Sequence, residues 1–143
     1  MNIDQPILNS GSEQIARRKH VLDLDDFTVD EINLIIENSA SMKEILSRDI
    51  KKVPALRGKT IITLFYEPST RTRVSYEQDG KIMSADEINI TGGGSSVEKG
   101  ESLVNTAKTI EAMNVDAVVI RHQEDCAVPI VIQSVQHGGT ILH

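Results

Sequence analysis

Hydroxyl and guanidinium groups are concentrated in one short stretch of the chain, Ser-Thr-Arg-Thr-Arg at residues 69–73. The stretch directly follows an apolar run that ends at Tyr66. An arginine binds a phosphate through two parallel hydrogen bonds, and hydroxyl groups add further donors. A helix that begins at Thr70 would add free backbone N–H groups and the positive end of its dipole. These residues predict an anion site, and the alternative is a solvated helix start with surface arginines.

The two arginines of this stretch are expected to differ in role. Residues two apart on a helix point to different sides, so only one of the two faces the ligand. We assign Arg71 to the ligand, because Arg73 has Glu77 one turn further on and suits a structural ion pair. Each hydrogen bond to a charged group contributes about 1.5–3 kcal/mol, so a few of them suffice for millimolar to micromolar phosphate binding.

A glycine-rich segment at residues 92–101 is the second candidate for anion binding. It does not fit the known phosphate loops, because Val97 breaks the dinucleotide fingerprint and Glu98 breaks the Walker pattern. The glycines predict a mobile loop that carries Ser95 and Lys99, both able to reach an anion outside their own fold. The alternative is a flexible, solvated loop without a ligand.

A third apolar run ends in a cation and an ionisable ring, Arg121 and His122. No spacing of histidines or paired carboxylates predicts a metal site. Cys126 lacks a partner pattern for nucleophilic catalysis, and small-residue packing is its expected role. Three strand ends with phosphate-binding residues, and without a base, nucleophile or metal, suit electrostatic stabilisation of a phosphate leaving group.

Strands that alternate with helices are expected to position these groups. Apolar and β-branched runs predict strands, and the segments between them predict helices, with strands at 60–66, 87–91, 115–121 and 140–142 and helices at 70–83, 101–113 and 127–135. The alternation predicts an α/β fold, a three-layer parallel sheet with helices on both faces and right-handed crossovers. Ligands of such sheets bind at the carboxyl ends of the strands, where the three polar clusters lie.

The chain before the first strand is predicted to hold an arm and one helix. The opening, Met1 to Ser12, is polar and without a period, and we expect a flexible arm over 1–19 and one domain over 20–143. A capping box, from Thr28 to Glu31, predicts a helix start. An apolar stripe at helical spacing follows, made of Ile32, Ile35, Ile36, Ile45 and Leu46.

The overall composition narrows the class of protein. A chain of 143 residues, 39% hydrophobic and 25% charged, suits one soluble globular domain. Its single cysteine excludes an internal disulfide framework and a cysteine-based zinc site. A formal net charge of −6 argues against non-specific nucleic-acid binding. No apolar run approaches the ~20 residues of a membrane helix, so we expect a cytoplasmic domain without membrane or nucleic-acid partners.

Three motifs in register resemble the aspartate/ornithine carbamoyltransferases. The segment from Phe65 to Glu77 is similar to their carbamoyl-phosphate signature, and the one from Ser95 to Ser102 to the mobile loop of the aspartate branch. The run from Val115 to His122 is similar to their third strand with its arginine. The likeness runs from about His20 to the last strand. Glu67 before a proline, where the ornithine branch usually has lysine, favours the aspartate branch, and an ornithine carbamoyltransferase domain is the alternative.

The resemblance implies the carbamoyl-phosphate-binding half of an enzyme that makes N-carbamoyl-L-aspartate from carbamoyl phosphate and L-aspartate in pyrimidine biosynthesis, without a metal or organic cofactor. The phosphate would be held by Ser69, Thr70, Arg71 and Thr72. Thr72 and Arg121 would also polarise the carbamoyl oxygen. Ser95 and Lys99 would reach a neighbouring subunit's site, since the family's catalytic unit is a trimer, and regulatory subunits are a further expected partner. The implied catalytic residues are Arg71, Thr72, Arg121 and Lys99.

The chain also departs from the family pattern. Gln123 stands where proline is common, Cys126 stands where glycine is usual, and Gly80 interrupts the second helix at a cost of about 1 kcal/mol relative to alanine. The family's aspartate-binding domain is absent from these residues, so we expect ligand binding without turnover from this chain alone. A non-catalytic assembly or regulatory module of the same fold is the alternative function.

Overall fold

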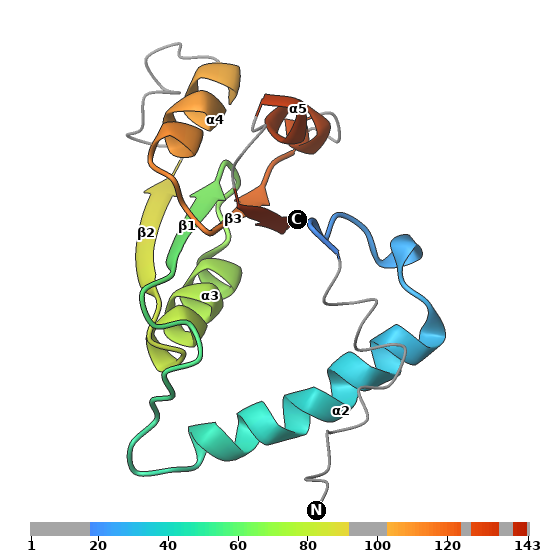
Figure 1. Cartoon of the computed structure of the whole chain (residues 1–143), viewed down its shortest axis with the longest axis vertical. Helices are drawn as coiled ribbons and strands as arrows, with labels where there is room; N and C mark the ends of the chain where they lie inside the picture. Colours follow the sequence, from blue (N-terminus) through green and yellow to red (C-terminus); the bar gives the residue numbers. More distant parts are fainter. Residues whose placement is uncertain (1–17, 92–102, 124–126, 135–138, 143) are drawn as a thin grey trace, which may run out of the picture.

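The computed structural model describes residues 18–91, 103–123, 127–134 and 139–142 (Figure 1). Strands and helices alternate from residue 60 onward, as the sequence predicts. The elements in chain order are η1 (Leu24–Asp26), α2 (Val29–Leu46), β1 (Thr60–Phe65), α3 (Thr70–Ile82), β2 (Asp86–Thr91), α4 (Leu103–Ala112), β3 (Ala117–Arg121), α5 (Ala127–Ser134) and β4 (Thr140–Leu142).

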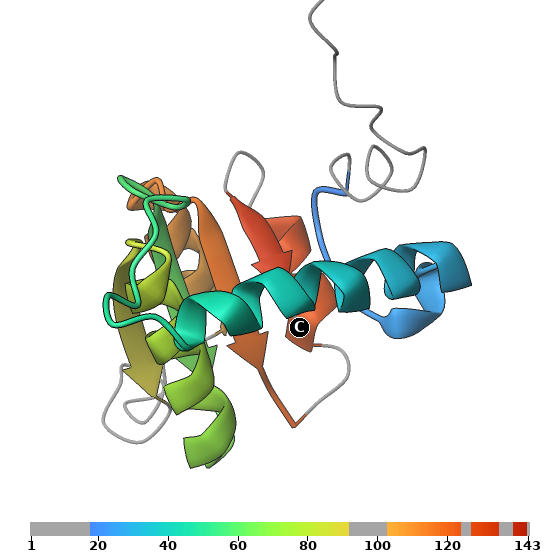
Figure 2. The ribbon, with the colours of Figure 1, turned by 90° about the horizontal axis from the view of Figure 1, so that it is seen from below.

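The strands of the described ranges form one parallel sheet in the order β2-β1-β3-β4. The chain leaves β1 toward β2 and then crosses over β1 to reach β3. Right-handed crossovers in opposite directions place α3 on one face of the sheet and α4 and α5 on the other. Figures 1 and 2 show this arrangement, with α3 in front of the sheet and α4 and α5 behind it in Figure 2. The predicted α/β fold is confirmed.

The core lies between the central strands and the α4–α5 layer. Its fully buried side chains on the strands are apolar, and they pack against small and branched residues of the two helices: Ile62, Leu64, Val118, Ile120, Ala107, Ile110 and Val131. β1 is buried from Ile62 onward, as expected of a strand covered on both faces. This rigid centre holds the carboxyl ends of β1 and β3 in place.

Helix α2 begins at the predicted capping box, but most of its predicted apolar stripe is not buried. Glu31 N donates to Thr28 Oγ1 over 3.3 Å, and Thr28 N donates to Glu31 Oε2 over 2.7 Å, which confirms the capping box. The predicted apolar stripe is mostly exposed, with Ile35 at 47% and Ile36 at 61%. Figure 1 shows α2 running clear of the sheet. Helical spacing shows which face is apolar, but it carries no information on what packs there.

Among the described residues, no helix is long and apolar enough to span a membrane.

The segment before η1 is attached to the sheet at β4. Val21 N donates to Ile141 O over 2.8 Å, and Ile141 N donates to His20 Nδ1 over 3.2 Å. Burial, together with the charge of Lys19, lowers the pKa of His20. The chain is therefore attached to the sheet at residues 20–21, and Arg18 pairs with Glu31 over 3.0 Å. The arm over 1–19 and the domain over 20–143 stay predictions, because residues 1–17 lie outside the described ranges.

A buried glycine lets α3 approach the edge strand β2. A Cβ atom on Gly80 would lie 2.9 Å from Oε2 of Glu87, so the missing side chain makes room for this carboxyl group. Both carboxyl oxygens of Glu87 are buried without a hydrogen-bond partner among the described residues. Burial and then the charge of Glu77 raise the pKa of Glu87, Lys81 opposes the shift, and Asp79 adds to it.

We expect Glu87→Gln to stabilise the domain at neutral pH by about 1 kcal/mol, because it removes a buried, unpaired charge. A raised folded pKa means that the folded state prefers the protonated carboxyl. The contribution of Glu87 is therefore most favourable below the ordinary pKa of 4.5 and is lost as the pH rises through the folded pKa. Urea unfolding at pH 4.5 and 7.5 measures the effect, with the exposed Glu37→Gln as control. A gain from Glu87→Gln that is equal at both pH values would contradict it.

Candidate functional site

The carboxyl ends of β1 and β3 form the crevice where the strand order reverses. Crossovers leave these neighbouring strands in opposite directions, and ligands of open parallel sheets bind at such points. Phe65 is the register partner of Arg121, and Tyr66 N donates to Arg121 O over 2.9 Å. The turn that leads into α3 therefore starts directly beside the end of β3.

A hydrogen-bonded network joins the two strand ends. Arg121 Nε donates to Glu67 Oε2 over 3.0 Å, and Arg121 Nη1 donates to Thr72 Oγ1 over 3.3 Å. Ser69 Oγ donates to the same Thr72 hydroxyl over 2.9 Å. The structure thus brings together Ser69, Thr72 and Arg121, three of the predicted site residues. We call Glu67, Ser69, Thr70, Thr72 and Arg121 the strand-end site.

The first turn of α3 adds backbone donors to this site. Ser69 is the N-cap residue, but its side chain makes no cap hydrogen bond, because its hydroxyl is turned toward Thr72. The first intrahelical bond runs from Arg73 N to Ser69 O over 3.1 Å. The N–H groups of residues 70–72 precede it and have no intrahelical acceptor. A helix start with free N–H groups favours an anionic ligand.

Two hollows meet at Glu67. The first, of about 330 Å³, is lined by residues that include Ser69, Thr70 and Arg73. The second, of about 400 Å³, is lined by residues that include Thr72, Arg121 and His122. Glu67 lines both hollows. The strand-end site therefore has space for a small anion on either side of the Glu67 carboxylate.

Glu67 belongs to the strand-end site, although the sequence patterns marked it only as the residue that favours the aspartate branch. Its carboxylate neutralises Arg121, whose side chain is 44% exposed against 26% for Glu67. An incoming anion must compete with this carboxylate for the guanidinium. The signal in the sequence was an acidic residue directly between a strand end and a proline, at the edge of the sheet where anion ligands were expected.

The two arginines of the first α3 turn differ in exposure and in the hollows that they line. The side chain of Arg71 is exposed, and the described linings of the two hollows include Arg73 but not Arg71. The predicted pair between Arg73 and Glu77 is not formed, because Glu77 pairs with Lys81 over 2.6 Å. A glutamate N-terminal to a lysine at i,i+4 is the more stable arrangement on a helix. The hydrogen bond from Lys81 lowers the pKa of Glu77, and Arg73 adds only a smaller effect of its charge.

Fewer contacts are described for the remaining predicted residues. Ser95, Lys99 and Cys126 lie outside the described residues. The ring of His122 packs against that of Tyr66, with centroids 4.7 Å apart. In the described part of the chain, no group of three or more histidine, cysteine or acidic side chains is placed to hold a metal.

Comparison with protein families identifies one match that spans most of the chain. Residues 19–137 match the family described as aspartate/ornithine carbamoyltransferase, carbamoyl-phosphate-binding domain. The aspartate carbamoyltransferase catalytic subunit of Roseiflexus castenholzii is 55% identical over 125 residues, which are 87% of this chain and 39% of that subunit. The corresponding subunit of Moorella thermoacetica is 50% identical over 131 residues, 89% of this chain and 43% of that subunit.

Solved structures of the same name share the fold. The catalytic subunit of aspartate transcarbamoylase from M. jannaschii is 35% identical with a TM-score of 0.75, over 87% of this chain and 40% of that chain. Aspartate transcarbamoylase from Trypanosoma cruzi, solved in complex with carbamoyl phosphate, is 25% identical with a TM-score of 0.77, over 87% of this chain and 37% of that chain. This chain spans about two fifths of the length of the curated relatives it matches.

Proposed function

Because this chain belongs to the aspartate/ornithine carbamoyltransferase family, as its carbamoyl-phosphate-binding domain, we propose that the strand-end site binds carbamoyl phosphate for carbamoyl transfer to L-aspartate. The observation that carries the proposal is the network of Arg121, Thr72 and Ser69 at the uncapped start of α3. Relatives at 50–55% identity named aspartate carbamoyltransferase support aspartate rather than ornithine as the acceptor.

In the proposed mechanism the strand-end site stabilises the negative charge that develops on the ligand. The phosphate lies at the α3 start, bound by residues 69–72, and Arg121 leaves Glu67 to bind the ligand. Arg121 and Thr72 donate hydrogen bonds to the carbamoyl oxygen while the aspartate amine attacks the carbamoyl carbon. The aspartate amine attacks in its neutral form. The new C–N bond forms, the C–O bond to phosphate breaks, and the leaving phosphate keeps the electron pair and takes up the proton that the amine loses. The donors of the α3 start are already in place, and together with Arg121 they stabilise the developing negative charge, which is the main contribution expected of this site.

The proposed partners and location extend the same assignment. We propose a cytoplasmic homotrimer in which Ser95 and Lys99 reach a neighbouring subunit's site, with regulatory subunits as further partners. The exposed apolar side chain of Ile88, at 45% on the sheet edge at β2, supports a protein contact at this edge. Light scattering should give a trimer mass, and a trimer mass for Ile88→Lys as well would argue against this contact.

Calorimetry with carbamoyl phosphate tests the binding assignment. We expect wild-type protein to bind with millimolar to micromolar affinity, and Arg71→Ala to weaken binding at least tenfold, because one charge-assisted donor is lost. Arg48→Ala is the matched control, since Arg48 is exposed at the end of α2 and pairs with Glu44. Equal heats from Arg71→Ala and the wild type would remove Arg71 from the site. Absence of any anion binding would favour the non-catalytic assembly module.

A colorimetric assay for carbamoyl aspartate tests whether these 143 residues are sufficient for turnover. The strand-end site offers groups for the phosphate and the carbamoyl oxygen, and the aspartate carboxylates need further cations. We therefore expect binding of carbamoyl phosphate by this chain alone without measurable turnover. Robust product formation would show that the acceptor site also lies within these residues.

A further inference from the structure

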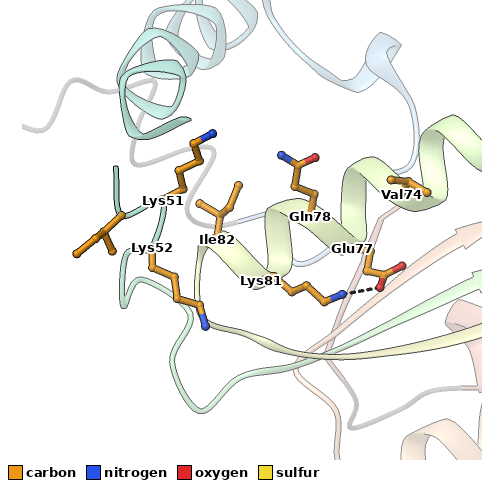
Figure 3. A pocket seen from close by; sticks show the side chains of 8 residues that line it. Lys51, Lys52, Val74, Glu77, Gln78, Lys81 and Ile82 are labelled. Carbon is orange, nitrogen blue, oxygen red and sulfur yellow. Dashed lines mark hydrogen bonds and ion pairs between the residues drawn. The ribbon is translucent and has the colours of Figure 1, made fainter. Parts of the chain in front are cut away.

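A separate hollow of about 540 Å³ lies between the loop after α2 and the C-terminal half of α3. Its lining includes three lysines and three branched apolar residues: Lys51, Lys52, Lys81, Ile50, Val74 and Ile82. Figure 3 shows the side chains of Lys51 and Lys52 on either side of Ile82, extending away from each other, with Lys81 bonded to Glu77 along the helix. We call it the lysine hollow.

The lysine hollow carries positive charge that the described residues do not balance. Lys81 pairs with Glu77 over 2.6 Å, so these two charges cancel. Lys51 and Lys52 have no carboxylate within ion-pair distance among the described residues. An adjoining hollow of about 450 Å³ shares Lys52 and Lys81 and adds one cation, Arg57, and one carboxylate, Asp86. In a chain of formal net charge −6, this concentration of cations favours an anionic ligand.

The apolar side chains of the hollow require a ligand with an apolar part. Ile50 is 78% exposed and Val74 is 46% exposed, and Ile82 lies between the two lysines. Covering such side chains with an apolar ring or chain removes their surface from water. The volume lies within the range of about 300–1,000 Å³ that is usual for small-molecule sites.

We propose that the lysine hollow binds a small amphiphilic anion, a phosphate ester with an apolar ring or chain. The two unbalanced ammonium groups match a phosphate monoester, which carries a charge of about −1.5 to −2 at pH 7. Lysines bind phosphate as flexible point charges and need no fixed donor geometry. The C-terminal half of α3 offers no free N–H groups, so Lys51 and Lys52 supply the donors. Both side chains turn from their positions in Figure 3 toward the phosphate, and the apolar body lies on Ile50, Val74 and Ile82.

The lysine hollow is independent of the strand-end site. The lining of the lysine hollow begins at Val74, one residue after Arg73 of the strand-end hollows, and extends to Ile82 at the end of α3. Their described lining residues do not overlap. Binding in the hollow can therefore be measured whether or not the strand-end site binds carbamoyl phosphate.

Calorimetry and amide chemical-shift mapping with 1-naphthyl phosphate test this proposal. We expect an affinity on the order of 0.1–1 mM, and a loss of at least tenfold in the double variant Lys51→Ala/Lys52→Ala. The matched control is Lys43→Ala/Lys108→Ala, which removes two exposed lysines of α2 and α4 and should bind like the wild type. Shifts are expected at residues 50–52 and 74–82.

Two further probes separate the sites and the forces. Arg71→Ala should keep its affinity for 1-naphthyl phosphate at the hollow, even where it loses carbamoyl phosphate. Neutral 1-naphthol should bind at least tenfold more weakly than the phosphate ester. Equal affinity of the Lys51→Ala/Lys52→Ala variant, equal binding of 1-naphthol, or shifts confined to residues 66–73 would each overturn the proposal.

Discussion

Replacing Arg121 by alanine is expected to weaken carbamoyl phosphate binding at least a hundredfold, or about 2.7 kcal/mol. Arg121 is the cation that the structure places between Glu67 and Thr72, at 3.0 and 3.3 Å. The substitution removes donors worth about 1.5–3 kcal/mol each to a charged ligand. It also leaves the Glu67 carboxylate unpaired beside the phosphate, which adds repulsion between like charges. Titration calorimetry at constant ionic strength measures the loss.

Glu67→Gln provides the matching half of a double-mutant cycle. Alone, it should tighten phosphate binding severalfold, because Arg121 no longer has to leave a carboxylate. Combined with Arg121→Ala, it should recover part of the lost affinity, since the unpaired charge is removed. Such non-additivity is expected of residues in direct contact. Strictly additive effects would mean that Glu67 does not restrain Arg121, and loss of affinity in Glu67→Gln would mean that the ion pair orients it for the ligand.

Gly139→Ala is expected to destabilise the domain by about 3 kcal/mol, a large part of the 5–15 kcal/mol typical of a domain. A Cβ atom there would overlap the backbone carbonyl of Asp116, which accepts the hydrogen bond from Thr140 N at the start of β4. The Asp116 carboxylate in turn binds Lys59 Nζ over 2.8 Å and Thr60 N over 2.9 Å. A shift of Asp116 therefore disturbs the starts of β1, β3 and β4 together.

Gly58→Ala is the matched control for this prediction. Gly58 has a φ of +77°, but no atom lies within 4 Å of the position of its missing Cβ. Its substitution strains only the local backbone, at a cost of about 1–2 kcal/mol. Urea unfolding of Gly139→Ala and Gly58→Ala compares the loss of unfolding free energy caused by a steric clash with the loss caused by local backbone strain. A Gly139→Ala protein at least as stable as Gly58→Ala would contradict the close approach to Asp116.

The boundaries of the described elements from β1 onward agree with the sequence patterns to within two residues, and the difference at β3 has an identifiable cause. α3 was predicted at 70–83 and spans Thr70–Ile82, because the hydroxyl-rich turn and the helical pattern are both local signals. β3 was predicted from Val115 and begins at Ala117. The side chain of Asp116 binds Lys59 and Thr60 at the start of β1, a contact that no local pattern predicts.

The candidate site was predictable in its composition and not in its connections. The sequence placed Ser69, Thr72 and Arg121 at the carboxyl ends of predicted strands. The sheet topology brings these residues together because it makes the two strands neighbours. It also assigned Arg73 to Glu77, while the structure pairs Glu77 with Lys81. Both candidate partners of Glu77 lie one turn away on the same helix, so spacing alone does not decide between them.

The sequence by itself determined the alternation of strands and helices, the start of α2 and the hydroxyl-rich start of α3 at residues 69–72, because these depend on neighbours within one or two turns. Only the tertiary structure decided the pairing of Arg121 with Glu67 across 54 positions, the seat of Glu87 against Gly80 and the contact of Gly139 with Asp116. Each of these depends on which distant backbone segments the sheet order brings together. The local sequence pattern shows which face of an element is apolar and which end is polar, and long-range packing determines what that face and that end contact.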